Sequence, residues 1–372
     1  RAGGDGVMAK LGEVCLLKAG KFVSANDISP EYNKGLYPCF GGNGIRGYVA
    51  DYTHDGEFPL IGRQGALCGN VNLASGKFHA TEHAVVVQPK IEMNVHWLYY
   101  ALNAMNLGQY ATGAAQPGLA VSKLETLSIE IPNISEQNKI AQTLYKVEQL
   151  VNFRKQQLAK LDELVKARFV EMFGTFPANP FRWSIGKIQD VVSDVRYGSS
   201  RPAVEGGKYP YLRMNNITYS GELDLRDTKR IDIPDSELDK CTVRRGDVLF
   251  NRTNSKELVG KTCVYNRDEL MVLAGFVIRV RINERIRPEV LSAFLNMDFS
   301  KRMLIGMCKT AIGQANINAK ELQNIDLYIP PIELQDQFVT LKNKIDQQKQ
   351  TVQQSLEKLE LLKKALMQEY FG

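Results

Sequence analysis

The chain has 372 residues, of which 44% are hydrophobic and 24% charged, a globular composition sufficient for two domains with their own cores. Its formal net charge of +6 permits a polyanionic partner without requiring one. The sequence contains no run of 18 or more apolar residues and no charged-then-apolar leader, so we expect a cytoplasmic protein with no membrane partner.

The cysteines and histidines do not indicate a metal site. The six cysteines occur singly, with no Cys-x-x-Cys pair, so neither a zinc knuckle nor a disulfide framework is expected, and the thiols should be reduced. His79 and His83 lie four residues apart, but beside a β-branched run rather than on a helix. We therefore expect no metal in this chain.

The chain is predicted to begin with a short non-native segment and a first globular domain. Residues 1–9 resemble a cloning remnant, with Met8 as the expected natural start. Residues 10–130 are rich in Gly, Asn, Tyr and short β-branched runs such as His83–Val87, which is typical of a mixed α+β domain with many turns. This segment holds 9 basic and 10 acidic residues, so it is close to neutral.

A helical region and a second globular domain follow, and the chain then ends with a second helical region. Residues 131–174 and 329–372 are predicted helical because 135–172 and 333–370 contain neither Pro nor Gly. Ser135 is the predicted N-cap of the first helix, and Gly174 its C-terminal glycine. Residues 175–328 form the second α+β domain, with 24 basic and 19 acidic residues.

The chain contains an internal repeat. Ile131–Gln137 recurs as Ile329–Gln335, at an offset of 198 that holds without a gap to the final Phe-Gly, with 16 identities over 44 positions. Upstream, Leu11–Val14 resembles Ile185–Ile188 at an offset of 174, which predicts 24 additional residues within the second copy. Matching ends around different middles predict a duplicated frame with pseudo-twofold symmetry.

The two predicted helices have complementary apolar rows. In heptad notation, an antiparallel pair would bury the apolar residues at position a of the first helix against those at position d of the second. A parallel pair would instead place Leu144 and Val151 against lysines. We therefore predict an antiparallel coiled coil; two unrelated amphipathic surface helices are the alternative. The pairing residues are Leu144, Val151, Leu158 and Val165 in the first helix, and Phe338, Ile345, Val352, Leu359 and Leu366 in the second.

Two glycine motifs are incomplete as nucleotide sites. Gly42–Gly47 matches G-x-G-x-x-G, but a strand-like run follows instead of a helix, so the glycines are predicted to form a tight loop. Val259–Thr262 resembles the end of a P-loop, yet the position of its first glycine is Ser255. Lys261 is therefore expected to be solvated or bound to phosphate, and we find no methyltransferase or nuclease motif.

Polar loops supply the candidate DNA-binding residues. Arg, Asn and Gln form bidentate hydrogen bonds with base edges, whereas Lys, Ser and Thr suit phosphates. Ordinary turn chemistry is the alternative for each residue, and Arg252, flanked by Asn251 and Asn254, is the strongest candidate. The candidates are Asn43, Arg46, Arg63, Gln64 and Lys77 in the first domain, and Arg196, Tyr197, Arg201, Arg213, Asn215, Asn216, Asn251, Arg252, Asn254 and Lys256 in the second.

The repeated Ile-Pro-x-Ile-x-x-Gln motif, followed by a long helix that ends near Phe-Gly, resembles the specificity subunits of type I restriction-modification enzymes. Tyr37-Pro38, Ile61–Gly65 and Gly246–Arg252 resemble stretches of their target recognition domains. The resemblance extends from about residue 10 to the end. It is weaker at Gln116, because the glycine lies three residues before it, whereas a glycine directly precedes Gln314.

The resemblance implies a non-catalytic chain whose two domains each read half of a split, asymmetric DNA sequence, while the paired helices set the gap. It further implies two methyltransferase subunits and restriction/translocase subunits as partners, with S-adenosylmethionine, ATP and Mg on those partners and no cofactor in this chain. Two other readings stay open. One is a coiled-coil scaffold with protein-binding globular ends, and the other is an enzyme that itself binds S-adenosylmethionine or ATP.

Overall fold

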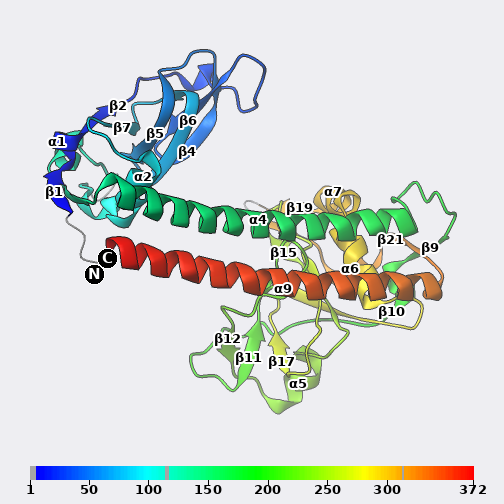
Figure 1. The fold of residues 1–372 in the computed structure, drawn as a ribbon. Helices are drawn as coiled ribbons and strands as arrows, with labels where there is room; N and C mark the ends of the chain where they lie inside the picture. Colours follow the sequence, from blue (N-terminus) through cyan, green and yellow to red (C-terminus); the bar gives the residue numbers. More distant parts are fainter. Residues whose placement is uncertain (1–5, 114–116, 312–313) are drawn as a thin grey trace. The chain divides into compact units, whose positions relative to one another are not determined.

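The computed structural model describes residues 6–113, 117–311 and 314–372. It divides into two compact units, which we call the first unit (1–155 and 354–372) and the second unit (156–353). Each unit contains strands, short helices and part of both long helices (Figure 1). The predicted mixture of helix and sheet around two globular parts is confirmed. Gln116 and Gly313 lie outside the described residues.

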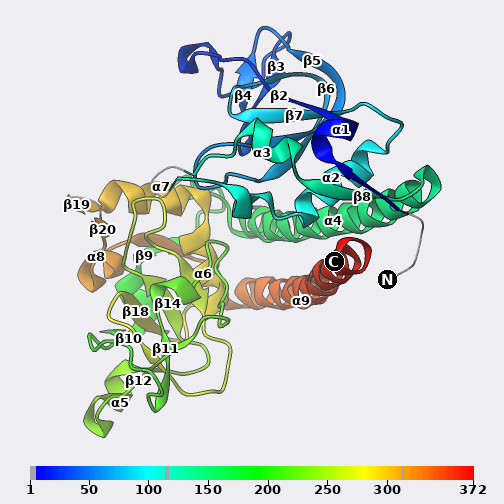
Figure 2. The ribbon, with the colours of Figure 1, turned by 90° about the vertical axis from the view of Figure 1, so that its left-hand side faces the viewer.

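The first unit is built on a six-stranded sheet (Figure 2). All neighbouring strands are antiparallel except β3 and β6, which are parallel. In sheet order the strands are β2 (Cys15–Ala19), β7 (Ala84–Pro89), β5 (His54–Gly62), β6 (Val71–Ala80), β3 (Tyr37–Gly41) and β4 (Gly44–Val49).

Strand β7 explains the unbroken apolar run seen in the sequence. Val85 and Val87 face a core cluster that contains Trp97 and Leu98 of α2 (Val95–Ala104). Ala84 and Val86 point to the other face and join a second cluster with Phe40, Leu60 and Phe78. Because both faces of the strand are buried, an alternating apolar-polar pattern is absent.

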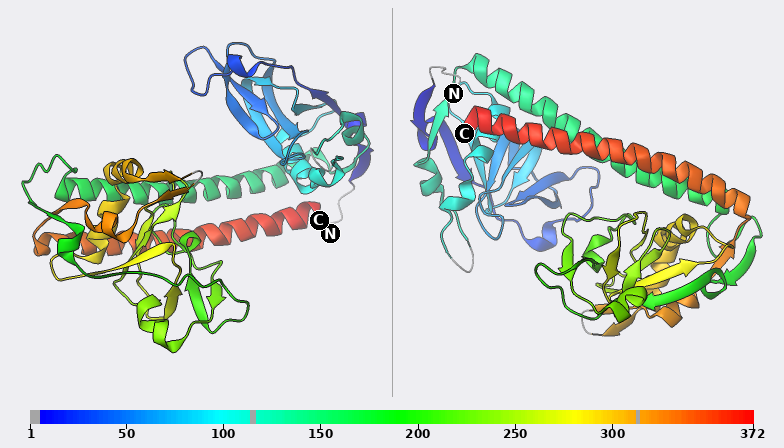
Figure 3. Two further views of the ribbon diagram at one scale, coloured as in Figure 1. Left: turned by 180° about the vertical axis from the view of Figure 1, so that it is seen from behind. Right: turned by 90° about the horizontal axis from the view of Figure 1, so that it is seen from below.

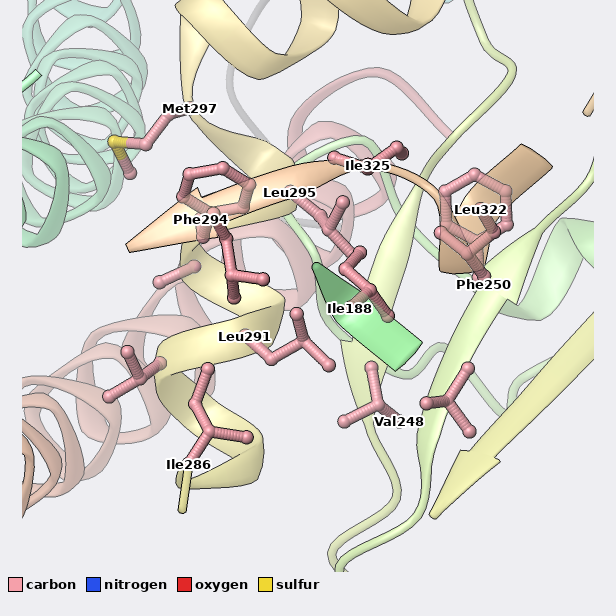
Figure 4. Packing of buried hydrophobic residues seen from close by; sticks show 14 of the residues in the cluster. Ile188, Val248, Phe250, Ile286, Leu291, Phe294, Leu295, Met297, Leu322 and Ile325 are labelled. Atoms are coloured by element: carbon pink, nitrogen blue, oxygen red, sulfur yellow. The ribbon is translucent and has the colours of Figure 1, made fainter. Parts of the chain in front are cut away.

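The second unit contains two four-stranded sheets and a small three-stranded sheet. Val248 and Phe250 of β14 enter the largest core cluster (Figure 4). Leu249, between them, enters the cluster that packs on the second sheet. The first sheet is β10 (Val192–Tyr197), β18 (Val277–Ile282), β14 (Val248–Asn251) and β16 (Thr262–Val264). The second is β12 (Lys229–Ile231), β11 (Tyr209–Leu212), β17 (Met271–Leu273) and β13 (Thr242–Val243), and the third is β15 (Thr253–Asn254), β20 (Gln314–Asn316) and β19 (Lys309–Ala311).

Short helices complete both units. The first unit has α1 (Leu11–Val14), α2 and α3 (Val121–Glu125), and the 3-10 turns η1 (Ala25–Asp27) and η2 (Leu107–Tyr110). The second unit has α5 (Asp235–Cys241), α6 (Pro288–Asn296), α7 (Asp298–Met307) and α8 (Ala319–Gln323), with the 3-10 turns η3 (Ile188–Val191) and η4 (Met214–Asn216).

The two predicted long helices are confirmed as α4 (Ile134–Phe173) and α9 (Ile332–Phe371), each of 40 residues. The predicted N-cap of α4 is wrong, because the Oδ1 of Asn133 accepts the Glu136 N–H at 3.0 Å and Ser135 lies inside the first turn. Gly174 follows α4 with φ +83°, the left-handed geometry of a C-terminal glycine.

Within each unit the segments of α4 and α9 run in opposite directions (Figure 3). In the first unit Glu148 pairs with Lys363, and the later Lys155 pairs with the earlier Glu360. In the second unit Asp162 pairs with Lys349, and the later Phe169 packs on the earlier Phe338. The coiled coil remains a prediction. Its residues Leu144, Val151, Phe338, Ile345 and Val352 are buried, and Leu158, Val165, Leu359 and Leu366 are half-buried.

The duplicated frame recurs at hydrogen-bond level, but its upstream register differs from the predicted one. Leu11 N–H donates to the Leu127 carbonyl at 2.8 Å, and Ile188 N–H donates to the Ile325 carbonyl at 2.9 Å. Leu11 therefore corresponds to Ile188, at an offset of 177, so the predicted pairing of Leu11 with Ile185 is wrong by three residues. Similarity of short apolar runs cannot distinguish these registers, whereas the strand pairs β1 (Val7–Lys10) with β8 (Ser128–Ile131), and β9 (Ser184–Lys187) with β21 (Asp326–Ile329), do.

The glutamine of the repeated motif has a structural function in both units. Gln137 is buried; its Oε1 accepts the Asn94 N–H at 2.9 Å and its Nε2 donates to the Pro132 carbonyl at 2.8 Å. Gln335 is likewise buried; its Oε1 accepts the Arg287 N–H at 2.8 Å, and its Nε2 donates to the carbonyls of Pro330 and Arg285. Each glutamine thus ties the N-cap of α2 or α6 to the start of a long helix.

Candidate functional site

Arg252 is held in a defined position at the end of β14. Its N–H donates to the Phe276 carbonyl at 3.0 Å, and its carbonyl accepts the Ile317 N–H at 2.9 Å. The guanidinium lies 4.8 Å from the ring centre of Tyr197, and one nitrogen reaches the Gly275 carbonyl at 3.5 Å. No carboxylate pairs with it among the described residues, and its Nε has no hydrogen-bond partner there. Arg252 is therefore a pre-ordered cation that has no carboxylate partner among the described residues.

The ring of Tyr197 packs against the guanidinium of Arg252. It ends β10, and its hydroxyl accepts the Ala319 N–H at the start of α8 at 2.8 Å. The ring is thus fixed at both ends while its face contacts the guanidinium. The sequence predicted Tyr197 as a DNA contact. The structure shows, in addition, that its ring contacts Arg252.

The other candidate arginines of the second unit are paired with carboxylates. Arg196 reaches Asp194 at 2.9 Å and Asp239 at 3.4 Å, and Arg213 reaches Asp227 at 3.0 Å. Arg201 holds Glu237 through two hydrogen bonds, which lower the pKa of the Glu237 carboxyl. Since each guanidinium already has an internal carboxylate partner, these three have less hydrogen-bonding capacity free for an external ligand than Arg252.

The candidate asparagines differ in what they do. Asn216 is buried and structural, because its Oδ1 accepts the Arg213 N–H at 2.9 Å and its Nδ2 donates to the Asp224 carbonyl at 2.8 Å. Asn254 accepts the N–H of Ser255 at 2.9 Å. Asn251 is fully buried, and neither polar atom of its amide has a partner among the described residues. Asn215 and Lys256 are exposed.

Lys261 differs from its predicted environment. It is only 8% exposed, and its Nζ donates to the Met214 carbonyl at 3.0 Å. The expectation of a solvated Lys261 is therefore wrong, and its interaction with phosphate remains a prediction. Lys261 follows a polar loop in the sequence, which suggested exposure, but it directly precedes strand β16.

In the first unit two predicted loops come together. Built on Gly62, a Cβ would lie 2.0 Å from the Gly42 carbonyl oxygen, so the loops touch through their backbones and the glycine is required. Gly44 has φ +96°. These contacts agree with the predicted tight loop and place Asn43 beside the segment that bears Arg63 and Gln64.

The charged candidates of the first unit form no ion pairs with described residues. Arg46 and Gln64 are exposed, and Arg63 is half-buried with an unpartnered Nε. Asn43 accepts a long hydrogen bond from Asn70 at 3.4 Å. Asn70 is a polar neighbour that sequence reasoning missed, since nothing but its position after Gly69 singled it out.

Lys77 is separate from those loops. It pairs with Asp55 in the strand register at the start of β5, whereas Arg63 follows the end of that strand. Its Nζ lies 4.7 Å from the ring centre of Tyr52, which packs on Tyr37 at 5.0 Å. Sequence reasoning missed this aromatic support because the two tyrosines lie 15 residues apart.

The structure reports two further properties of the described residues. No helix in residues 6–113, 117–311 and 314–372 is long and apolar enough to cross a membrane. The same residues contain no group of three His, Cys, Asp or Glu side chains that could hold a metal ion. His79 instead lies 3.2 Å from the Lys21 carbonyl, and His83 lies 3.1 Å from Glu82.

The chain matches the family described as "Type I restriction modification DNA specificity domain" over residues 5–163 and 182–361. It is 52% identical over 149 residues to the EcoprrI specificity subunit of Escherichia coli, covering 40% of this chain and 37% of that protein. It is 22% identical over 260 residues to the EcoKI specificity subunit of Escherichia coli K12, covering 66% and 56%. The matches thus span less than two thirds of the length of either relative.

Two solved structures share the fold. A type I S subunit from M. genitalium superposes with a TM-score of 0.64 at 17% identity, covering 100% of this chain and 97% of that one. A chain from a study of "complex assembly and conformational transition of the type I R-M system" superposes with a TM-score of 0.54, also at 17% identity, covering 98% and 97%.

Proposed function

The chain belongs to the type I restriction-modification DNA specificity family, and we propose that its two units read the two halves of a split, asymmetric DNA sequence. This proposal rests on the duplicated frame: equivalent framing residues in the two units surround candidate loops that differ. Gln137 and Gln335 make equivalent hydrogen bonds in the two units, as do Leu11 and Ile188. The candidate loops inside the two frames differ in residues and partners, so the two half-sequences should differ.

We further propose that α4 and α9 form an antiparallel coiled coil that sets the gap between the half-sequences. A 40-residue helix is about 60 Å long. Support comes from opposite-charge pairs that cross between the helices in each unit, Glu148 with Lys363 and Asp162 with Lys349. Pseudo-twofold symmetry would follow from the duplication.

We assign the methylation and restriction reactions to partner proteins. Two methyltransferase subunits would bind this chain and methylate adenine with S-adenosylmethionine, and restriction/translocase subunits would use ATP and Mg. This chain would supply sequence recognition and docking, without a catalytic residue.

The test is a map of methylated adenines in the host genome, with and without the gene for this chain. We expect one bipartite motif that disappears on deletion and returns when the gene is restored. A motif that persists after deletion would contradict the proposal. Purified full chain, alone and with its co-expressed methyltransferase, should also bind duplex DNA with an affinity that falls as salt rises.

A protein-binding scaffold is the second candidate, favoured by exposed apolar side chains on the first-unit part of α4. Tyr145 is 45% exposed, Leu150 46% and Phe153 60%. Such residues suit a protein partner. Salt-independent DNA binding, or none at all, together with stable binding of a protein partner, would favour this reading.

A further inference from the structure

Two buried lysines of the second unit have no acidic partner among the described residues. Four basic side chains there are at most 9% exposed: Lys261, Arg279, Lys301 and Lys349. Arg279 pairs with Asp194, and Lys349 pairs with Asp162 and Glu222. Lys261 and Lys301 reach only backbone carbonyls. A buried charge without an opposite charge disfavours the fold, so its presence calls for a function.

Both lysines hold the candidate recognition loop, residues 251–261. The Nζ of Lys301, on α7, donates to the Gly260 carbonyl at 2.6 Å. The Nζ of Lys261 donates to the Met214 carbonyl at 3.0 Å, which joins this loop to the loop that bears Asn215. The backbone between Asn251 and Lys261 is closed by a 2.8 Å hydrogen bond. Arg252, Asn254 and Lys256 lie between these anchors.

The surroundings disfavour the charged forms of both lysines. Burial, together with the nearby cations Lys166 and Lys261, lowers the pKa of Lys301 to about 7. Lys166 is itself paired with Asp298. Burial also lowers the pKa of Lys261, and Cys263 on β16 acts in the opposite direction.

We propose that Lys261 and Lys301 are positioning residues whose charge is balanced by the phosphate backbone of bound DNA, and that they hold loop 251–261 in its reading position. The inference rests on the proposed function. Bound DNA supplies Lys261 and Lys301 with the negative charge that no acidic side chain among the described residues provides. The pair therefore contributes to affinity through the loop and through its field, without contacting a base.

Proton uptake on binding follows from this arrangement. A nearby phosphate favours the ammonium form of Lys301, so DNA raises the pKa of that group above its value in the free chain. Above pH 7 the free chain must gain a proton when it binds. Affinity should therefore fall by up to about tenfold per pH unit between pH 7 and 9.

The experiment measures DNA binding by the full chain with its co-expressed methyltransferase, for wild type, Lys301→Met, Lys261→Met and the control Lys187→Met. Lys187 is a partly exposed lysine of the same unit, paired with Asp326 at 3.0 Å, so the control makes the same substitution at a lysine whose charge has an acidic partner. We expect each buried variant to bind about tenfold more weakly, with a shallower salt dependence and no loss of thermal stability. Lys187→Met should change little.

The outcomes separate the two proposals. Failure of the wild type to bind DNA would overturn the proposed function. Wild-type binding with unchanged affinity, salt dependence and methylated motif in both buried variants would overturn only the inference. If a variant does not fold, the wild-type pH profile decides, and an affinity that is flat between pH 7 and 9 contradicts the inference.

Discussion

The two units present their cations differently. The segment 175–328 has 24 basic and 19 acidic residues, whereas 10–130 has 9 and 10. Yet Arg196, Arg201 and Arg213 of the charge-rich unit are occupied by internal carboxylates. Arg46 and Arg63 of the near-neutral unit have no carboxylate among the described residues. Net charge and the pairing state of each guanidinium therefore favour different residues as DNA contacts, and the proposed reading surface follows the pairing state.

The repeated glutamines provide the largest expected difference between the units. Replacing Gln335 by Leu leaves one buried N–H and two carbonyls without partners, at a cost of about 3 kcal/mol in unfolding free energy. Replacing Gln137 by Leu leaves one N–H and one carbonyl, at a cost of about 2 kcal/mol. Urea unfolding followed through Trp183 in the second unit and Trp97 in the first measures each effect. Larger destabilisation by the Gln137 variant would contradict this ranking.

Arg252 tests whether the pairing state predicts DNA contacts. Arg252→Ala should weaken specific binding by about 2 kcal/mol, or roughly thirtyfold, and relax one half of the methylated motif, because a bidentate arginine–base contact is lost. Arg201→Ala is the matched control, since its guanidinium is held by Glu237, and it should change affinity less than about threefold. Equal losses in the two variants, or relaxation of the other half-sequence, would show that the assignment is wrong.

The lysines between the long helices test the helix pairing in each unit. Lys349→Met should cost about 2 kcal/mol of stability, because Asp162 and Glu222 lose a buried common cation but still reach water. Lys363→Met should cost less than about 1 kcal/mol, because Lys363 is 33% exposed and Glu148 keeps the Tyr100 hydroxyl. Thermal unfolding compares the two variants, and equal costs would mean that burial does not distinguish the pairs.

Acid should weaken the two units in different pH ranges, with the smallest effects of the four. In the first unit burial lowers the pKa of His54, helped by His79, Lys18 and Lys21. Folding thus disfavours its charged form, and stability present above pH 6.5 is lost as pH falls below that value.

In the second unit, the carboxyl groups with lowered pKa values lose their stabilising effect only at lower pH. Hydrogen bonds from Arg226 lower the pKa of Asp224 to about 2. Arg279 and Arg196 lower the pKa of Asp194 despite its partial burial. Their contribution is present above pH 4 and is lost as pH falls toward 2. Single-tryptophan variants Trp97→Phe and Trp183→Phe report each unit separately, and simultaneous loss in both units would contradict the difference.

The sequence alone determined the features that depend on periodicity and repetition. A helix that lacks Pro and Gly over 38 residues is decided locally, so the predicted stretches 135–172 and 333–370 end one residue inside the observed ends of both long helices. The repeat predicted the duplicated frame, because Gln137 and Gln335 carry the same hydrogen bonds wherever the frame is built. The tight turn at Gly42 and Asn43 followed from the backbone freedom of glycine, although Gly44–Gly47 belong to strand β4 and not to the predicted loop.

Only the tertiary structure decided which polar side chains are available. Arg196, Arg201, Arg213 and Arg252 look alike in the sequence, and their carboxylate partners lie 2 to 43 residues away or are absent among the described residues. Lys261 is buried against the Met214 carbonyl, 47 residues away in the sequence. The correspondence of Leu11 with Ile188 was decided by the strand pairs β1–β8 and β9–β21. Most of these contacts arise between segments remote in sequence, so no local pattern encodes them.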